Sequence, residues 1–181
     1  MAGPRLTTPS QKGPTAVSAR PARVPATLPL TPAQLRIVRR IADGESTATI
    51  ATQLSITIGT INVQVQHCGQ KLGVTGRAAV VHACFVTGQL PRPEKAVLPG
   101  VLSKAEAETW RMVASGMTSL EVAEQAGISR GDALGRIRAL RERVRADNDP
   151  HLVKLGWSHE VLDESLTEMA SGTVLRAPVP R

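Results

Sequence analysis

Apolar residues recur at three- and four-residue spacing in three successive segments of the first half of the chain. In chain order, the apolar positions are Leu35, Val38, Ile41 and Ala42, then Ile50, Ala51 and Leu54, then Ile61, Val65, Cys68 and Leu72. This period is typical of amphipathic α-helices that bury one face. The pattern predicts three short helices around one core, followed by a fourth helix from Gly76 to about Phe85.

Residues that favour helix ends stand at the boundaries of these segments. Thr31 and Gln34 form a capping box, in which a hydroxyl and an amide satisfy free N–H groups at a helix start. Other hydroxyl residues placed to cap a helix are Ser46, Thr57, Ser103, Thr118 and Ser129. Gly44 and Gly116 suit the left-handed residue that closes a helix. An all-α chain is therefore expected.

The chain contains an internal repeat without gaps. Leu102 aligns with Leu30, 72 residues earlier, and identical pairs continue at that separation. They include Arg39/Arg111, Ala42/Ala114, Gly44/Gly116, Ala51/Ala123, Gln53/Gln125, Ile56/Ile128 and Gly59/Gly131. The match fades after Leu72, which indicates a tandem duplication whose second copy has diverged at its end.

Proline content and charge mark the segments outside the two copies. Residues 1–29 contain six Pro, four basic residues and no acidic residue, a composition typical of a disordered arm. The predicted organisation is a basic arm over 1–29, a first domain over 30–90, a Pro-containing linker over 91–101 and a second domain over 102–162. A tail over 163–181, whose first residues are compatible with a helix, completes the chain.

The step between the second and third predicted helices has helix-turn-helix spacing in both copies. In the second copy, Ala123 is followed at i+4 by Gly127, where Ala lets two helices approach and Gly permits the turn. The first copy has Ala51 and Ser55 at the matching positions. The chain is therefore predicted to form two tandem small helix-turn-helix bundles, each of about four short helices.

The first copy resembles the LuxR-type helix-turn-helix domain. The resemblance rests on Leu30-Thr31-Pro32, Ile41-Ala42-Asp43-Gly44, Ile50-Ala51, Leu54, Thr60-Ile61, Lys71-Leu72-Gly73-Val74 and Arg77-Ala78, and residues 102–162 resemble a degenerate second member. It implies sequence-specific binding of duplex DNA by the third helix and dimerisation through the fourth. The chain departs from the family in two places, with Asn62 where Lys is common and Gln64 where His is frequent. A sensory domain, which such proteins usually carry, is not expected here.

The outward face of the third helix is the predicted base-reading surface. It presents Ile58, Gly59, Asn62, Val63, Gln66 and Gln70, and the predicted DNA-binding set also includes Thr57 and Lys71. Asn and Gln can pair bidentately with adenine, and Val63 can contact a thymine methyl group. The alternative is an exposed polar face with no role in DNA binding.

The equivalent helix of the second copy carries a line of arginines. Arg130, Arg138, Arg141 and Arg145 are predicted to face outward and bind successive phosphates. The alternative is a solvated face on which Glu142 pairs locally with Arg138 or Arg145. The second copy as a whole is charge-balanced, with nine basic and nine acidic residues.

Composition narrows the remaining possibilities. A net charge of +7 favours an anionic partner, whereas three aromatic residues and no Tyr leave little for stacking single-stranded bases. His67-Cys68 and His82-x-Cys84 lack convincing metal-ligand spacing, and both cysteines fall on apolar helix faces. No metal, cofactor, enzymatic activity or membrane span is expected, and the expected compartment is the cytoplasm.

These observations predict a DNA-binding transcription regulator without a sensory domain of its own. Two alternatives stay open, namely an interaction protein that binds RNA polymerase or a partner regulator, and an architectural DNA-binding protein. Two arrangements on DNA also stay open. One is a homodimer through residues 78–86, and the other is an internal pseudo-dimer in which the tethered copies read unlike half-sites about 10 base pairs apart.

Overall fold

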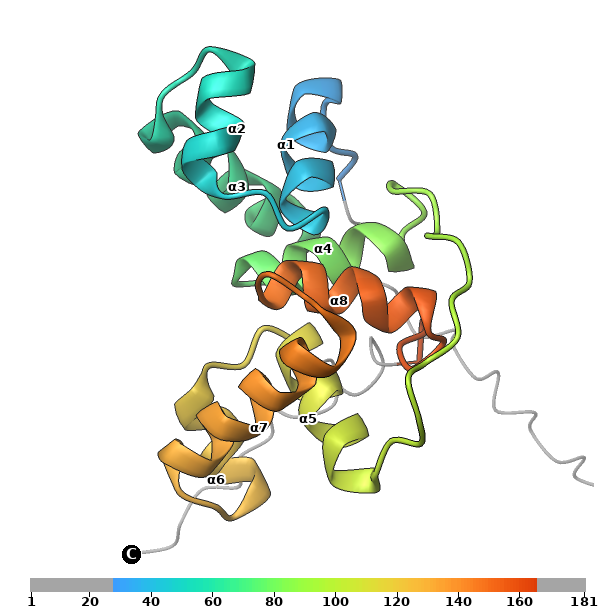
Figure 1. Cartoon of the computed structure of the whole chain (residues 1–181). Coiled ribbons are helices and arrows are strands. Elements are labelled where there is room, and N and C mark those ends of the chain that lie inside the picture. Colours follow the sequence, from blue (N-terminus) through green and yellow to red (C-terminus); the bar gives the residue numbers. More distant parts are fainter. Residues whose placement is uncertain (1–27, 166–181) are drawn as a thin grey trace, which may run out of the picture.

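The computed structural model describes residues 28–165, and these form eight α-helices without a strand (Figure 1). The helices are α1 (Pro32–Ala42), α2 (Thr47–Leu54), α3 (Ile58–Leu72), α4 (Arg77–Val86), α5 (Lys104–Ala114), α6 (Ser119–Ala126), α7 (Arg130–Val144) and α8 (Asp149–Ser158). The expected all-α fold is confirmed over this range. None of the described helices is long and apolar enough to span a membrane. Residues 1–27 of the predicted arm, and the predicted tail from residue 166, lie outside the described residues.

Every helix of the second copy begins and ends 72 residues after its counterpart in the first copy. The fourth helix, α8, is therefore present, as expected for a second copy of about four short helices, although the sequence match to the first copy fades after Leu72. A different sequence forms the same helix there, since Asn148 caps α8 and Leu152, Val153 and Trp157 bury its inner face. Burial of an apolar face, more than residue identity, decides whether such a short helix forms.

The predicted helix starts are confirmed. Thr31 and Ser103 each complete a capping box, with Gln34 and Glu106 respectively as the reciprocal partners. The other predicted hydroxyl caps each accept a backbone N–H at the start of α2, α3, α6 or α7, and they are Ser46, Thr57, Thr118 and Ser129. These caps position α3 and α7 directly after the turns of their helix-turn-helix units.

The two copies fill equivalent core positions with side chains of different size. Val38 of α1 and Trp110 of α5 are counterparts, and both are fully buried. Cys84 of α4 has Gly156 of α8 as its counterpart, and a Cβ added to Gly156 would lie 2.5 Å from Leu162 Cδ1 and 2.8 Å from Trp110 Nε1. The larger indole in α5 is therefore accommodated by the missing side chain in α8. This exchange offsets part of the volume that the larger side chain adds.

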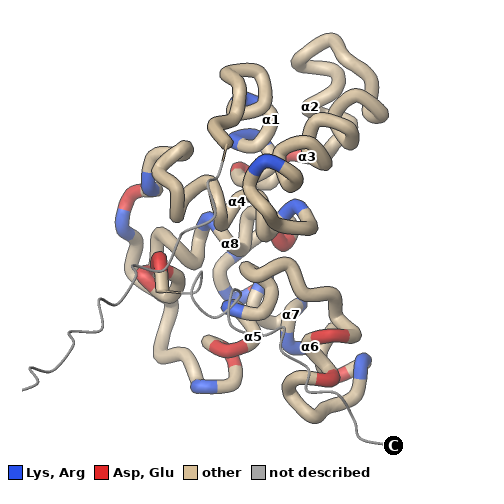
Figure 2. The backbone as a smooth tube through the Cα atoms, turned by 180° about the vertical axis from the view of Figure 1, so that it is seen from behind, with Lys and Arg blue, Asp and Glu red and all other residues tan. Residues whose placement is uncertain are grey.

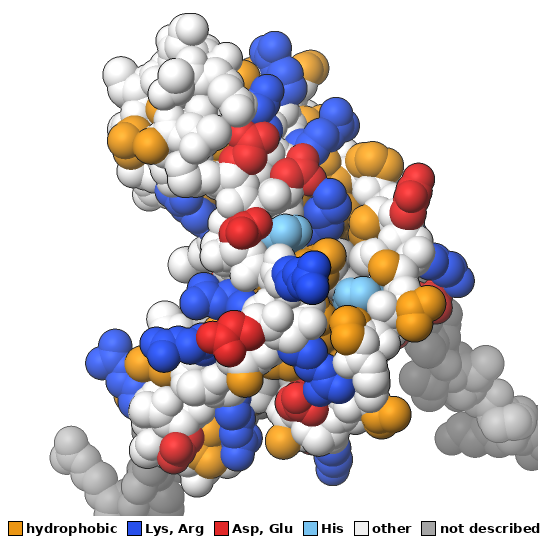
Figure 3. Space-filling view, in the orientation of Figure 1, with side chains coloured by type: hydrophobic (Ala, Val, Ile, Leu, Met, Phe, Trp, Pro, Cys, Tyr) orange, Lys and Arg blue, Asp and Glu red, His pale blue; other side chains and the backbone are white. Residues whose placement is uncertain are grey.

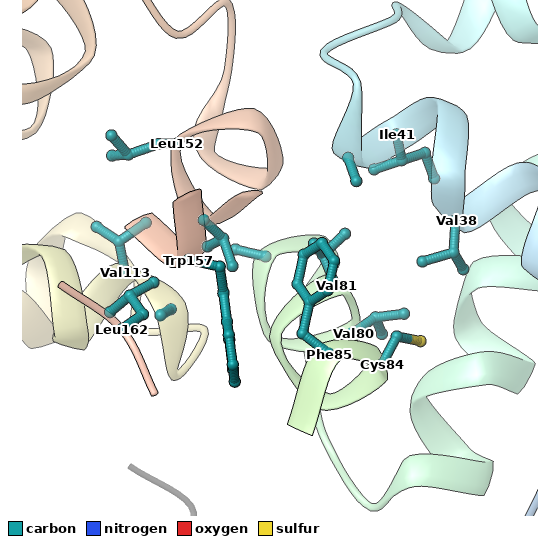
Figure 4. Close-up of a cluster of buried hydrophobic side chains, with 14 of the residues drawn as sticks. Val38, Ile41, Val80, Val81, Cys84, Phe85, Val113, Leu152, Trp157 and Leu162 are labelled. Atoms are coloured by element: carbon teal, nitrogen blue, oxygen red, sulfur yellow. The ribbon is translucent and has the colours of Figure 1, made fainter. Parts of the chain in front are cut away.

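The copies pack against each other mainly through α4 and α8. Phe85 and Trp157, which are counterparts in the repeat, contact each other with ring centroids 5.6 Å apart (Figure 4). Val81 and Val153 are also counterparts, and both are fully buried. Where a residue meets its own counterpart, an approximate two-fold axis passes between the two copies.

Glycines after α1 and α5 provide reciprocal evidence for this axis. Gly44 has φ +87° and Gly116 has φ +86°, the left-handed conformation expected from the sequence. A Cβ added to Gly44 would lie 2.7 Å from His151 Nδ1, and one added to Gly116 would lie 2.9 Å from the Cβ of Ala79, the counterpart of His151. The carbonyl oxygen of Thr75 would be closer still. Each copy thus docks its α1-type turn against the fourth helix of the other.

The segment predicted as a linker lies along α8. Ala96 N–H donates to the carbonyl oxygen of Ser158 at 2.9 Å, and Ser158 Oγ donates to the carbonyl oxygen of Glu94 at 2.5 Å. The Arg92 guanidinium lies 5.3 Å from the centre of the Trp157 ring, within range of a cation–π interaction. The connection between the copies is therefore packed onto the interface that it bridges.

Candidate nucleic-acid interface

The outer face of α3 is exposed, as the helix periodicity predicts. Ile58 and Val63 are 50% and 47% exposed, which is high for large apolar side chains. Gly59, Asn62 and Gln66 are also exposed, whereas Thr57 acts as the N-cap of the helix. The face therefore combines methyl groups and amides, the groups that contact base edges in a major groove.

The helix-turn-helix unit of the first copy is almost free of charge. No Asp, Glu, Lys or Arg occurs between Ser46 and Gln70. Figure 2 shows α2 without a charged position, and the corresponding lobe at the upper left of Figure 3 is white and orange. Such a surface has little to attract phosphates on its own, so any affinity for DNA needs cations from neighbouring elements.

The positively charged side chain of Arg77, which was not among the predicted DNA-binding residues, reaches this face from α4. Arg77 Nη1 donates to Thr47 Oγ1 at 2.7 Å, and Arg77 Nη2 donates to Asn62 Oδ1 at 2.7 Å. The side chain thus joins the first turns of α4 and α2 to the reading face of α3. The available signal in the sequence is that Arg77 is the only charged residue between Leu72 and Arg92.

Gln70 and Lys71, both in the predicted DNA-binding set, line a groove of about 770 Å³ between α1 and α3. Lys71 Nζ donates to Gln34 Oε1 at 3.0 Å and to the carbonyl oxygen of Pro29 at 3.4 Å. Arg143, its counterpart, repeats this tie by donating to the carboxylate of Glu106 at 2.8 Å. Lys71 therefore holds α3 against α1, and its contacts are those of a structural side chain.

The arginine line on α7 divides into two groups. Arg141 forms an ion pair with Asp149 at 3.5 Å. Arg130 and Arg138 on α7 are exposed, as is Arg145, which lies just past the end of the helix as its C-cap in the left-handed conformation (φ +56°). These three arginines form no ion pair with any other residue in the range 28–165. The local pairing of Glu142 that was the alternative for this face is likewise absent from that range.

At the positions that match the reading face of α3, α7 presents different chemistry. Leu134 replaces Asn62 and is 47% exposed, and Arg138 replaces Gln66. Views from the front and from behind both place α3 and α7 on the same side of the α4–α8 pair, at opposite ends of the molecule (Figures 1 and 2). The molecule therefore carries one amide-bearing and one arginine-bearing helix on one side.

The buried titratable groups belong to the core. His82 lies between the copies, where its Nδ1 accepts from Trp157 Nε1 at 3.0 Å, and burial lowers its pKa to about 4. Cys68 and Cys84 are fully buried, as expected, and burial raises the pKa of the Cys84 thiol to about 12. Within residues 28–165, no group of three potential metal-ligating side chains comes together.

In the described residues, the helices of the first copy recur 72 residues later in the second, and α3 and α7 are the exposed helices at matching positions. Residues 28–84 match a family model described as bacterial regulatory proteins, luxR family, so this segment is similar to the helix-turn-helix domain of that family. The family is typically one of DNA-binding regulators. The second copy lies outside the matched residues. Searches of curated proteins and of solved structures each found no match to this chain.

Proposed function

We propose that this protein is a DNA-binding transcription regulator whose two helix-turn-helix copies act as an internal pseudo-dimer on one duplex. The observation that carries the proposal is the reciprocal packing of α4 and α8 about an approximate two-fold axis. A two-fold arrangement of reading helices suits two half-sites about one helical turn, ~10 base pairs, apart. A cytoplasmic location follows from a DNA target.

The two copies have unlike roles in this proposal. The first copy reads bases through α3, with Asn62, Val63 and Gln66 closest to the groove and Ile58 available for methyl contacts. The second copy binds phosphates through α7. The arginines available for that task are Arg130, Arg138 and Arg145. The protein then binds an asymmetric site, because α7 has no amide at the positions of Asn62 and Gln66.

The burial of α4 supports the internal pseudo-dimer over a homodimer through residues 78–86. All of these residues are buried within the chain except Ala83 and Val86, which are partly exposed. A second chain could use this helix only after α8 had separated from it. That separation would expose Phe85 and Trp157 to water, at a cost of several kcal/mol.

A second candidate function rests on apolar exposure in the second copy. Leu120 on α6 and Leu134 on α7 are 52% and 47% exposed. Exposed leucines on a helix-turn-helix unit suit contact with a protein, such as RNA polymerase or a partner regulator. In that case the second copy would bind protein while the first copy bound DNA.

Selection of bound sequences from a random duplex library tests the proposal. The full chain should enrich an asymmetric site with one strongly specified half-site and a weaker contact about 10 base pairs away. Competition with bulk DNA should leave the preference intact at physiological salt. Enrichment of no sequence would contradict the proposal, whereas a specified single half-site with no second contact would favour the second candidate.

A further inference from the structure

We propose that Asn62 reads a keto base, guanine or thymine, because Arg77 holds its carbonyl oxygen and leaves its amide N–H groups to face DNA. The inference rests on the proposed function, since it names the base class that the first half-site presents to α3. It replaces the expectation that Asn62 pairs bidentately with adenine. Arg77 is thereby a positioning residue that sets specificity without touching a base.

The orientation of the Asn62 amide follows from the chemistry of its partner. A guanidinium has only donors, so the amide atom that faces Arg77 Nη2 at 2.7 Å has to be the oxygen. The guanidinium is itself anchored by its second bond to Thr47 Oγ1, also 2.7 Å long. Turning the Asn62 amide over would break its bond to Arg77, because the amide N–H groups would then face the guanidinium N–H groups.

The charge of Arg77 acts in the same direction. Arg77 forms no ion pair with another residue in the range 28–165, and no acidic residue occurs between Ser46 and Gln70. Its positive charge therefore polarises the Asn62 carbonyl and strengthens the amide N–H groups as donors. The same charge disfavours a base that presents an amino group nearby.

Major-groove edges divide the four bases accordingly. Guanine presents acceptors at N7 and O6 and thymine presents one at O4, whereas adenine presents an N7 acceptor beside an amino donor and cytosine presents an amino donor alone, so in both of these bases an amino group would face the positive charge of Arg77. The bidentate pairing of Asn with adenine needs the amide oxygen and nitrogen on one free edge. In this protein the oxygen faces Arg77, so the free donor matches a keto base.

The second copy lacks this device. The counterparts of Thr47, Asn62 and Arg77 are Ser119, Leu134 and Asp149. Asp149, at the start of α8, forms an ion pair with Arg141 of α7. Leu134 has no side-chain group that could donate a hydrogen bond to a base. The keto preference is therefore expected at one position of one half-site only.

The test measures base preference at the position that Asn62 contacts. Library selection with the Asn62→Ala variant of the full chain identifies the base pair that Asn62 contacts. It is the position of the DNA site at which the variant loses the base preference that the wild type shows. Affinities of the wild-type chain are then measured on four duplexes that differ only in that base pair. Arg77→Met removes both hydrogen bonds and the charge, and Arg39→Met removes an exposed arginine of α1 as the matched control.

The wild type should favour guanine or thymine over adenine and cytosine by about tenfold at this position. Arg77→Met should shift the preference toward adenine, because the freed amide can then pair bidentately, while Arg39→Met should keep the wild-type ranking. A wild-type preference for adenine, or an unchanged ranking in Arg77→Met, would overturn the inference. If Arg77→Met fails to fold, the affinities of the wild-type chain on the four duplexes decide whether the inference holds. Absence of any sequence preference in the wild type would instead reject the proposed function.

Discussion

The Gly116→Ala substitution tests the reciprocal docking of the two copies. Gly116 ends the turn after α5 with φ +86°, and an added Cβ would lie 2.9 Å from the Cβ of Ala79 on the other copy. The carbonyl oxygen of Thr75 would be nearer still, and a backbone atom cannot move aside as a flexible side chain can. The substitution therefore combines backbone strain with overlap across the interface.

Gly127→Ala separates these two effects. Gly127 has φ +64°, and an added Cβ there would meet nothing within 4 Å. An alanine in the left-handed region costs about 1–2 kcal/mol, and this cost is shared by both variants. The overlap at Gly116 should add about 1–3 kcal/mol, as expected for overpacking in a well-packed interface.

Urea and thermal unfolding followed by circular dichroism measure the difference. At about 3 °C per kcal/mol for a domain of this size, Gly116→Ala should melt roughly 3–9 °C below Gly127→Ala. Gly44→Ala, at the reciprocal contact, should lose less stability than Gly116→Ala, because the atoms nearest to its added Cβ, Asp147 Oδ2 and His151 Nδ1 at 2.7 Å, belong to side chains that can move aside. Equal losses in Gly116→Ala and Gly127→Ala would refute the close approach between the copies.

Three further predictions concern the core, the buried histidine and the arginine line. Gly156→Cys should destabilise the protein by about 1–3 kcal/mol through overlap with Leu162 and with the indole of Trp110. Adding Trp110→Val should restore the part of that loss that the indole causes, as measured in a double-mutant cycle. Burial in the fold lowers the pKa of His82 from 6.5 to about 4. The free energy of unfolding should therefore be unaffected by this group above pH 6.5 and should fall by up to about 3 kcal/mol as the pH falls to 4. Urea titrations should show this decline in the wild type and not in His82→Gln. Replacing Arg138 and Arg145 with Gln should weaken binding to every duplex and flatten the slope of log affinity against log salt by about 2, whereas an unchanged slope would remove both from the phosphate contacts.

The helices of the first copy could be predicted from the sequence because their signals are local. Capping residues such as Thr31, and apolar positions at helical spacing, each act within one or two turns of the chain. The helix-turn-helix unit of the second copy could be predicted because the repeat carries the same signals. α8 is different, since its residues no longer match those of α4 and its formation depends on burial against α4 and α5.

The candidate site could be predicted in part. The exposed face of α3 follows from periodicity, so Asn62 and Gln66 could be placed on it. The contact from Arg77 could not be predicted, because it joins positions 15 residues apart through the packing of α4 on α3. The ties of Lys71 and Arg143 to the preceding helices are likewise tertiary, and charge alone suggests phosphate contacts for both.

The stoichiometry of the DNA complex tests the internal pseudo-dimer most directly. The site found by selection is footprinted, and the mass of the complex on that duplex is measured by native mass spectrometry or light scattering. The account predicts one chain on an asymmetric site, with protection on one face of the DNA at two patches about 10 base pairs apart. Two chains on a palindromic site would contradict it.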